Sequence, residues 1–299
     1  MLPRHPAGRP PQLRVPRRAP AEPCRFGPLQ SHVDSYRSSG TTLAYSQGVV
    51  SATADAVLLG AGALAGIVGT AGGITSLISY PALLSVGLPV LPANVTNIVA
   101  LVACGPGAAL ASRPELAGRG SWLRRWALMA AAGAAVGSAL LLSTPTGVFG
   151  RVVPFLLVFA SISLLAQPKL SAWQDKHRVG GNQYLLPCGL FAVSVYNGYF
   201  GAGAGVMVLA LLLLTVDQHV ARANALKNVL AGVATVVAAA AFAFFGPVDW
   251  TAAAPLALGM FVGSTVGPSV ARRIPGDVLR WLVALTGLGL AIRLWVVPN

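Results

Sequence analysis

The chain has 299 residues, of which 55% are hydrophobic and only 10% are charged, and its mean hydropathy is +0.69. Soluble domains carry about 25% charged residues, so this composition excludes an ordinary soluble domain and indicates an integral membrane protein. The net charge of +13 does not indicate nucleic-acid binding, because the basic residues lie mostly in the first 37 residues and in short loops. Basic loops of a membrane protein report its orientation instead.

Residues 1–48 are rich in Pro, Arg, Gly and Ser and contain no apolar run. Such a segment cannot bury enough surface to offset the entropy of ordering it, so we expect a disordered, basic N-terminal extension. Two interpretations stay open. The extension is either a cytoplasmic tail that contacts anionic lipid, or sequence upstream of a true translation start near Val49. We favour the second, because the apolar pattern begins there.

Eight apolar segments follow, and about 20 such residues suffice for one membrane crossing. They cover approximately residues 54–86, 93–111, 126–142, 148–165, 184–216, 223–245, 251–270 and 278–296. The first and the fifth are about 33 residues long, and each is broken by glycines. This order predicts an all-α integral membrane protein with two homologous four-segment halves, 49–166 and 183–299, joined by a charged cytoplasmic linker at 167–182.

The basic loops predict how the segments are oriented. Loops 113–125 and 169–178 and the Arg272-Arg273 pair should all be cytoplasmic. Segment 184–216 must then enter and leave on the same side, as a hairpin of two short helices that meet at the glycines, and segment 54–88 does the same from the other side. The halves would therefore be inverted repeats. In the alternative, each long segment crosses once, which places Arg272-Arg273 outside.

The two glycine breaks are the first candidate site. One runs from Gly66 to Gly73 and the other from Gly198 to Gly205, and the candidate ligand-binding glycines within them are Gly69, Gly72, Gly73, Gly201, Gly203 and Gly205. A helix that restarts after a break presents free N–H groups and the positive end of its dipole, which suits an anion. The alternative is close helix packing through small residues. A duplicated break with matching flanks favours a transporter binding site.

A polar patch follows each break. Asn94 and Asn97 open one segment, and Asn224, Lys227 and Asn228 open its counterpart. Asn94 and Asn224 are expected to be helix N-caps, whereas the other three lie one turn deeper and can face the breaks. A lysine within a membrane segment is costly and marks a substrate path by default. The alternative for Lys227 is that its side chain snorkels to the interface.

Other chemistry is not indicated. Asp55 and Asp217 lie at segment ends and are expected to be solvated caps. The cysteines, Cys24, Cys104 and Cys188, have no metal-binding spacing, and the chain has no Ser-His-acid set and no P-loop. We therefore expect no catalytic residue, no metal and no cofactor.

The glycine elements resemble those of a known family. The element at Gly66–Gly73, the turn at 87–89, the element at Gly198–Gly205, the turn at 246–250 and the ending at 272–275 are together similar to the sulfite exporter TauE/SafE family over about residues 52–297. The resemblance implies a polytopic inner-membrane permease driven by ion gradients, with several relatives linked to export of sulfite or organosulfonates. The chain departs from the family pattern where alanines replace frequent glycines, which bears on substrate more than on fold.

These observations predict a secondary transporter, not an enzyme. It would export a small anion, such as sulfite or an organosulfonate, across the cell (inner) membrane by alternating access. Its partners would be the anion and the lipid bilayer, with no nucleic acid, and a homo-oligomer is left open. The alternative is a membrane subunit of a larger complex without autonomous transport.

Overall fold

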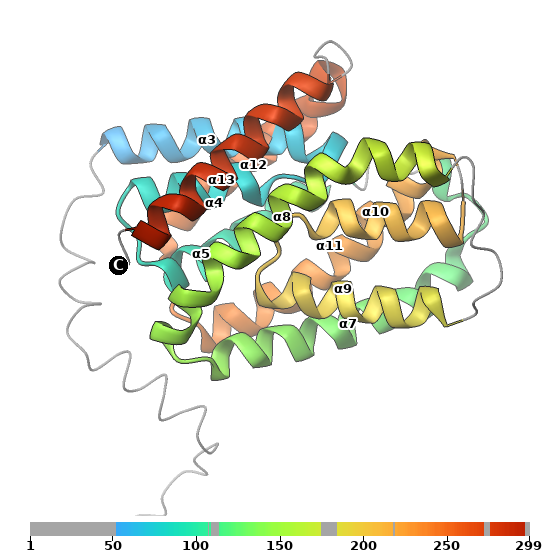
Figure 1. The fold of residues 1–299 in the computed structure, drawn as a ribbon, viewed down its shortest axis with the longest axis horizontal. Helices are drawn as coiled ribbons and strands as arrows, with labels where there is room; N and C mark the ends of the chain where they lie inside the picture. Colours follow the sequence, from blue (N-terminus) through green and yellow to red (C-terminus); the bar gives the residue numbers. More distant parts are fainter. Residues whose placement is uncertain are drawn as a thin grey trace, which may run out of the picture.

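The structure is a computed structural model that describes residues 52–106, 108, 114–174, 184–217, 219–271 and 276–296. The described residues form ten α-helices and two short 3-10 helices with no strand, which confirms the all-α prediction (Figure 1). The predicted disordered extension at 1–48 lies outside these residues. The predicted linker lies only partly within them, because helix α8 continues to Gln174.

The helices match the eight predicted segments within a few residues at most ends. In chain order they are α3 (Ala52–Gly72), α4 (Ser76–Ser85), α5 (Val90–Leu101), η1 (Val102–Cys104), η2 (Pro114–Leu116), α7 (Gly120–Ser143), α8 (Thr146–Gln174), α9 (Leu185–Tyr199), α10 (Ala204–Thr215), α11 (Val220–Phe245), α12 (Trp250–Ala271) and α13 (Gly276–Val296). Each of the two broken segments consists of two helices, α3 with α4 and α9 with α10, and the chain between them includes Gly73 in the first segment and Gly201 and Gly203 in the second.

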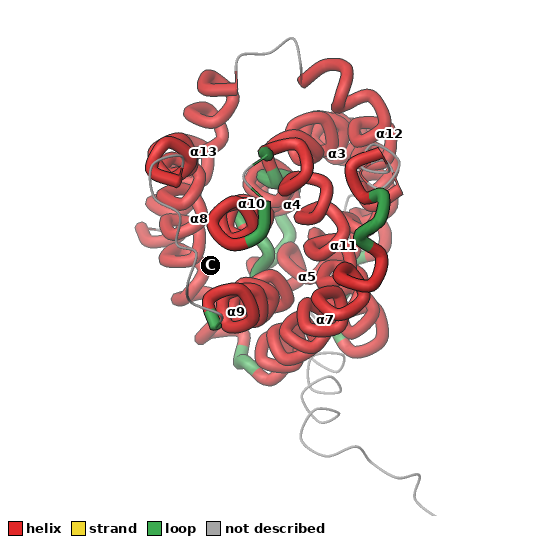
Figure 2. Tube along the Cα trace, turned by 90° about the vertical axis from the view of Figure 1, so that its right-hand side faces the viewer, coloured by secondary structure: helices red, strands yellow, loops and turns green. Residues whose placement is uncertain are grey.

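Length and polarity fit a membrane. Within the described residues, four helices are long and apolar enough to cross a bilayer, and they cover Ala52–Gly69, Gly120–Ser143, Thr146–Ala166 and Val220–Phe245. Helices α4, α5 and α10 have 10, 12 and 12 residues and are too short to cross alone. Large apolar side chains such as Leu128 and Phe244 point outward, as lipid-facing residues do. Figure 2 shows α4 and α10 near the centre, with longer helices around them.

The two ends of the bundle can be named from two contacts. At the Asp249 end, the backbone N–H of Asp249 donates to Thr96 Oγ1 (3.0 Å) and joins the α11–α12 turn to α5. At the Asp217 end, Arg119 before α7 donates to Asp217 Oδ2 (2.9 Å) after α10. Helix α11 separates these ends by about 39 Å, at 1.5 Å per residue. Helix α5 therefore begins at the Asp249 end, and α11 begins at the Asp217 end.

Two parallel helix pairs pack through glycines in the same way. A Cβ added to Gly263 on α12 would overlap the carbonyl oxygen of Ala63 on α3, and one added to Gly137 on α7 would overlap that of Val195 on α9. Only small residues allow two helix backbones to approach so closely within a membrane. Because α3 runs beside α12 and α9 beside α7, the hairpins α3–α4 and α9–α10 enter the bundle from opposite ends.

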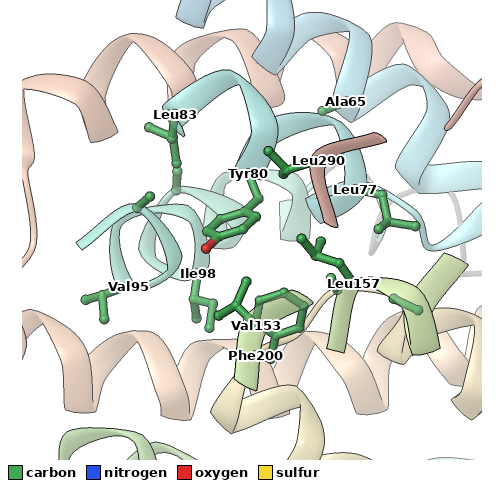
Figure 3. Close-up of a cluster of buried hydrophobic side chains, with 14 of the residues drawn as sticks. Ala65, Leu77, Tyr80, Leu83, Val95, Ile98, Val153, Leu157, Phe200 and Leu290 are labelled. Carbon is green, nitrogen blue, oxygen red and sulfur yellow. The ribbon is translucent and has the colours of Figure 1, made fainter. Parts of the chain in front are cut away.

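The second break joins the first hairpin in one hydrophobic core, part of which Figure 3 shows, whereas most buried residues of α10 form a separate cluster with α11. Tyr80 on α4 packs edge-on against Phe200 in the second break, with ring centroids 5.6 Å apart. The Tyr80 hydroxyl donates to the Val90 carbonyl (3.1 Å). Val153 on α8 and Leu290 on α13 complete the group from the outer helices. The hairpin of one half is thus held in place by residues of the other.

Two expectations about α5 and α11 are wrong in detail. Helix α5 was expected to reach residue 111 but ends at Leu101 and continues as the 3-10 turn η1. Helical backbone resumes at 105–106 and 108, with Pro106 in the first turn, where proline is tolerated, so the segment is interrupted by η1. The helices also begin earlier than expected, with Pro89 and His219 at the N-cap positions, so Asn94 and Asn224 lie inside the helices and cap neither.

Candidate functional site

The two glycine breaks touch each other at the centre of the protein. A Cβ added to Gly73 would lie 3.0 Å from the Cα of Gly205, and one added to Gly205 would lie 2.9 Å from the Cα of Gly73. Both distances are shorter than ordinary carbon–carbon contacts. Gly73 also has a φ of +70°, a conformation that side chains with a Cβ rarely adopt. Glycine is therefore required at this contact for both space and conformation.

A cavity of about 440 Å³ lies against this contact. Its wall includes Gly69, Gly73, Gly201, Gly205, Lys227 and Asn228 from the predicted set. The cavity therefore takes its lining from both breaks and from α11. Elsewhere the wall is largely apolar, with valines of α11 and the η1 region. Among the described residues, no group of three or more His, Cys, Asp or Glu side chains could hold a metal ion.

Lys227 is the one cation of this wall within the described residues. It lies two turns inside α11, and its side chain is only 2% exposed. Its Nζ is buried and has no hydrogen-bond partner among the described residues. The snorkelling interpretation does not fit this geometry, because a snorkelling lysine keeps its ammonium in water. A buried ammonium without a partner is costly, and an anion in the cavity would offset that cost.

The structure places three of the predicted asparagines away from the cavity wall. Asn97 is fully buried, and its Oδ1 accepts a hydrogen bond from Ser79. Asn94 donates to the carbonyl of Tyr199 (3.1 Å) and so ties α5 to the end of α9. Asn224 is half-buried on α11. One polar atom of each has no partner among the described residues, namely Asn94 Oδ1, Asn97 Nδ2 and Asn224 Oδ1. Asn94 and Asn97 thus have a structural contact that the sequence did not indicate.

The glycines of each break differ in whether they pack against a neighbouring helix or line the cavity. Gly66 lies against a carbonyl of α12 and Gly198 against a carbonyl of α7, so these two serve helix packing. Gly72 is the last residue of α3. Gly203 has a φ of +77°, occupies the N-cap of α10 and packs on α8 rather than on the cavity. Packing therefore explains Gly66, Gly198 and Gly203, whereas Gly69, Gly73, Gly201 and Gly205 line the cavity.

Four polar residues of the wall were missed from the sequence: Thr75, Ser76, Asn197 and Thr235. Thr75 and Ser76 directly follow the first break, and Asn197 directly precedes the second. Asn197 Nδ2 lies 3.4 Å from Thr235 Oγ1 and links α9 to α11 across the wall. Adjacency to the glycines was a usable signal for the first three. No local pattern distinguishes Thr235 from other threonines in apolar helices.

Asp217 is not the solvated cap that was expected. It is buried, and its carboxylate contacts Arg119 (2.9 Å), the Nδ1 of His219 (3.2 Å) and Arg222 (3.8 Å). Burial alone raises the pKa of Asp217, but the hydrogen bonds from His219 and the charges of Arg119 and Arg222 outweigh it and hold this pKa below its ordinary value. The cluster joins the start of α7 to the α10–α11 turn.

Comparison with known proteins identifies the family. The family model described as "Sulfite exporter TauE/SafE" matches residues 56–294. The chain belongs to the TauE/SafE family. It is 30% identical over 248 residues to "Probable membrane transporter protein ORF9" of Sinorhizobium sp, covering 82% of this chain and 93% of the relative. It is 27% identical over 239 residues to a "Probable membrane transporter protein" of Haemophilus influenzae, covering 77% and 90%.

A further relative is "Probable membrane transporter protein YfcA" of Escherichia coli strain K12, 25% identical over 237 residues, which cover 77% of this chain and 86% of the relative. No solved structure matches the chain. As a TauE/SafE protein, the chain is a multi-pass membrane transporter and not an enzyme. The family match spans both glycine breaks, the cavity and the Asp217 cluster.

Proposed function

We propose that this TauE/SafE protein is a secondary transporter that exports a small anion, such as sulfite or an organosulfonate, through the cavity between the two hairpins. The observation that carries this proposal is the buried Lys227, whose ammonium has no partner among the described residues and which lies on the cavity wall. A permanent structural role would leave this charge uncompensated. A small anion that binds and leaves compensates it transiently, which is what transport requires.

The breaks add to this preference for anions. Helix α4 begins at Ser76 and α10 at Ala204, both next to the contact between Gly73 and Gly205. The first N–H groups of a helix have no partner within it, and the helix dipole places partial positive charge there. Non-helical backbone at this depth is tolerated where it lines a cavity. The N–H groups of Leu77, Ile78, Ala204 and Val206 already donate to carbonyls of the preceding turn, so the two helix N-termini add partial positive charge to the full charge of Lys227.

Alternating access through inverted repeats is the mechanism that we propose. The same kind of glycine contact occurs twice. Gly263 of α12 lies against Ala63 of α3, and Gly137 of α7 lies against Val195 of α9, so α9 and α7 correspond to α3 and α12. Likewise α4 packs on α13 and α10 on α8. The hairpins enter from opposite ends, as the inverted arrangement requires. Two such halves can rock against each other around a fixed central site.

The charges of the described residues suggest which end is cytoplasmic. Arg119, Arg124, Arg125 and Arg222 lie at the Asp217 end, where α7 and α11 begin. Cytoplasmic loops carry the excess of Arg and Lys, so we assign the Asp217 end to the cytoplasm. An exported anion would then enter the cavity from this end.

The experiment is uptake by the purified protein in liposomes, tested separately with sulfite, sulfoacetate and thiosulfate. We expect accumulation of at least one of them with the single protein and an imposed ion gradient. Loss of uptake in Lys227→Ala, at an unchanged yield of folded protein, would support the site. Absence of uptake for all three anions would contradict the proposal. Recovery of uptake only after a membrane extract is added would favour the alternative, a subunit that requires a partner.

A further inference from the structure

We propose that Thr75 and Ser76 determine which anions the site accepts, by donating hydrogen bonds from their hydroxyls to oxygen atoms of the anion. This inference rests on the proposed function. It adds groups that distinguish one anion from another, which Lys227 alone does not do. An ammonium attracts any anion. Hydroxyl groups at fixed positions select an anion whose oxygens lie where those groups point.

The two hydroxyls are available to a ligand. Thr75 and Ser76 both line the cavity, and Ser76 is only 5% exposed. Within the described residues neither hydroxyl has a hydrogen-bond partner, whereas the next hydroxyl along α4, that of Ser79, contacts both the Thr75 carbonyl and Asn97. A hydroxyl on a cavity wall can donate to an acceptor that enters the cavity. The unpartnered ammonium of Lys227 belongs to the same wall.

Gly69 holds Thr75 in its position. A Cβ on Gly69 would overlap Thr75 Oγ1 and lie 2.8 Å from Thr75 Cβ. The Thr75 side chain therefore occupies the space that any other residue at position 69 would fill. Gly69 lines the cavity but acts on the ligand through Thr75, so it is a positioning residue. This explains a glycine one turn before Gly73, where the chain direction does not yet change.

The halves contribute different groups. Gly73 and Gly205 touch, and when they are taken as equivalent the second half has Met207 and Val208 where the first has Thr75 and Ser76. Conversely, the second half places Lys227 on the cavity wall, whereas Asn97, from the matching polar patch of the first half, does not line the cavity. The hydroxyls thus come from one half and the charge from the other. An oxyanion with several acceptor oxygens can bind both at once, so the two halves hold the ligand jointly.

The test is uptake kinetics in liposomes with Thr75→Val, Thr75→Ser and Ser76→Ala, measured for the anion that the wild-type protein transports. We expect Thr75→Val and Ser76→Ala each to raise KM about 10-fold to 100-fold, the range for a hydrogen bond to a charged group, with a smaller change in the maximal rate. Thr75→Ser retains the hydroxyl and should stay within about 3-fold of wild type. The matched controls are Ser264→Ala and Thr286→Val, whose hydroxyls bond to backbone carbonyls away from the cavity. Both should leave KM unchanged.

The outcomes separate this inference from the proposed function. If the wild-type protein transports none of the anions, the proposed function itself fails. If it transports and Lys227→Ala does not, but Thr75→Val and Ser76→Ala keep the wild-type KM, only the inference is overturned. Equal loss in Thr75→Ser and Thr75→Val also overturns it, because the methyl group, not the hydroxyl, would then be responsible. If Thr75→Val does not fold, Ser76→Ala decides in the same way.

Discussion

Replacing one glycine in each of the two parallel helix pairs tests whether the halves are built alike. The changes are Gly137→Ala on α7 and Gly263→Ala on α12. The added Cβ would overlap the carbonyl oxygen of Val195 or of Ala63, and the carbonyl carbons behind them would lie only 2.9 Å and 2.8 Å away, so each pair must separate by about 1 Å or more. Overpacking of this kind lowers the free energy of unfolding by about 1–3 kcal/mol, and the higher helix propensity of alanine raises it by about 1 kcal/mol. The net range is about 0–2 kcal/mol, and because the added Cβ overlaps a carbonyl oxygen we expect each variant to lose about 2 kcal/mol.

The assay is reversible unfolding in mixed micelles, followed by tryptophan fluorescence. Gly60→Ala on α3 and Gly289→Ala on α13 are matched controls, because a Cβ at either position meets nothing within 4 Å. They gain the helix propensity without the clash and should be neutral or slightly more stable. If Gly137→Ala and Gly263→Ala behave like these controls, the packing argument is wrong. If only one of them is destabilised, the proposed equivalence of the two helix pairs is wrong.

Two further predictions concern the Asp217 end and the orientation of the chain. Asp217→Asn should lower the melting temperature at pH 7, since it removes the carboxylate that Arg119 and His219 contact. Because the folded-state pKa of Asp217 lies below its unfolded value, this carboxylate stabilises the fold above about pH 4 and loses its effect as pH falls through the folded-state pKa, so the gap between wild type and variant should close on acidification. A gap that is constant down to pH 3 would contradict the ion-pair account. Single cysteines at the exposed Tyr184 and Val220, in a background without native cysteines, should react with impermeant reagents from the same side of the membrane. Labelling of the two from opposite sides would mean that 184–216 crosses once and would refute the inverted arrangement.

Much of the fold could be predicted because a bilayer leaves few options for an apolar chain. Backbone groups in lipid must be paired within helices, so apolar runs give helix positions directly. Basic loops then set direction, which correctly indicated that 184–216 is a hairpin rather than one crossing. The 3-10 turn η1 that interrupts this segment was not predicted, and helical backbone resumes beyond it at 105–106 and 108.

The site was harder to predict because it depends on contacts between distant segments. That Gly73 touches Gly205 follows from how two hairpins meet, and no local pattern encodes it. For the same reason Asn97 was placed at the cavity, whereas it bonds to Ser79 behind the wall. Thr75 was overlooked because a threonine that follows a glycine break is common in turns. Its contact with Gly69 depends on the turn between α3 and α4, which the sequence alone does not define.

The most direct test of the central claim is anion uptake by Lys227→Met, compared with wild type in the same liposomes. Methionine has a similar volume and removes the charge, so the anion loses its counter-charge while the packing of α11 is kept. The account predicts no measurable uptake, together with a melting temperature equal to or above that of wild type, because a buried ammonium without a partner destabilises the fold. Uptake at the wild-type rate would contradict the account. A variant that loses its fold together with uptake would assign Lys227 a structural role instead.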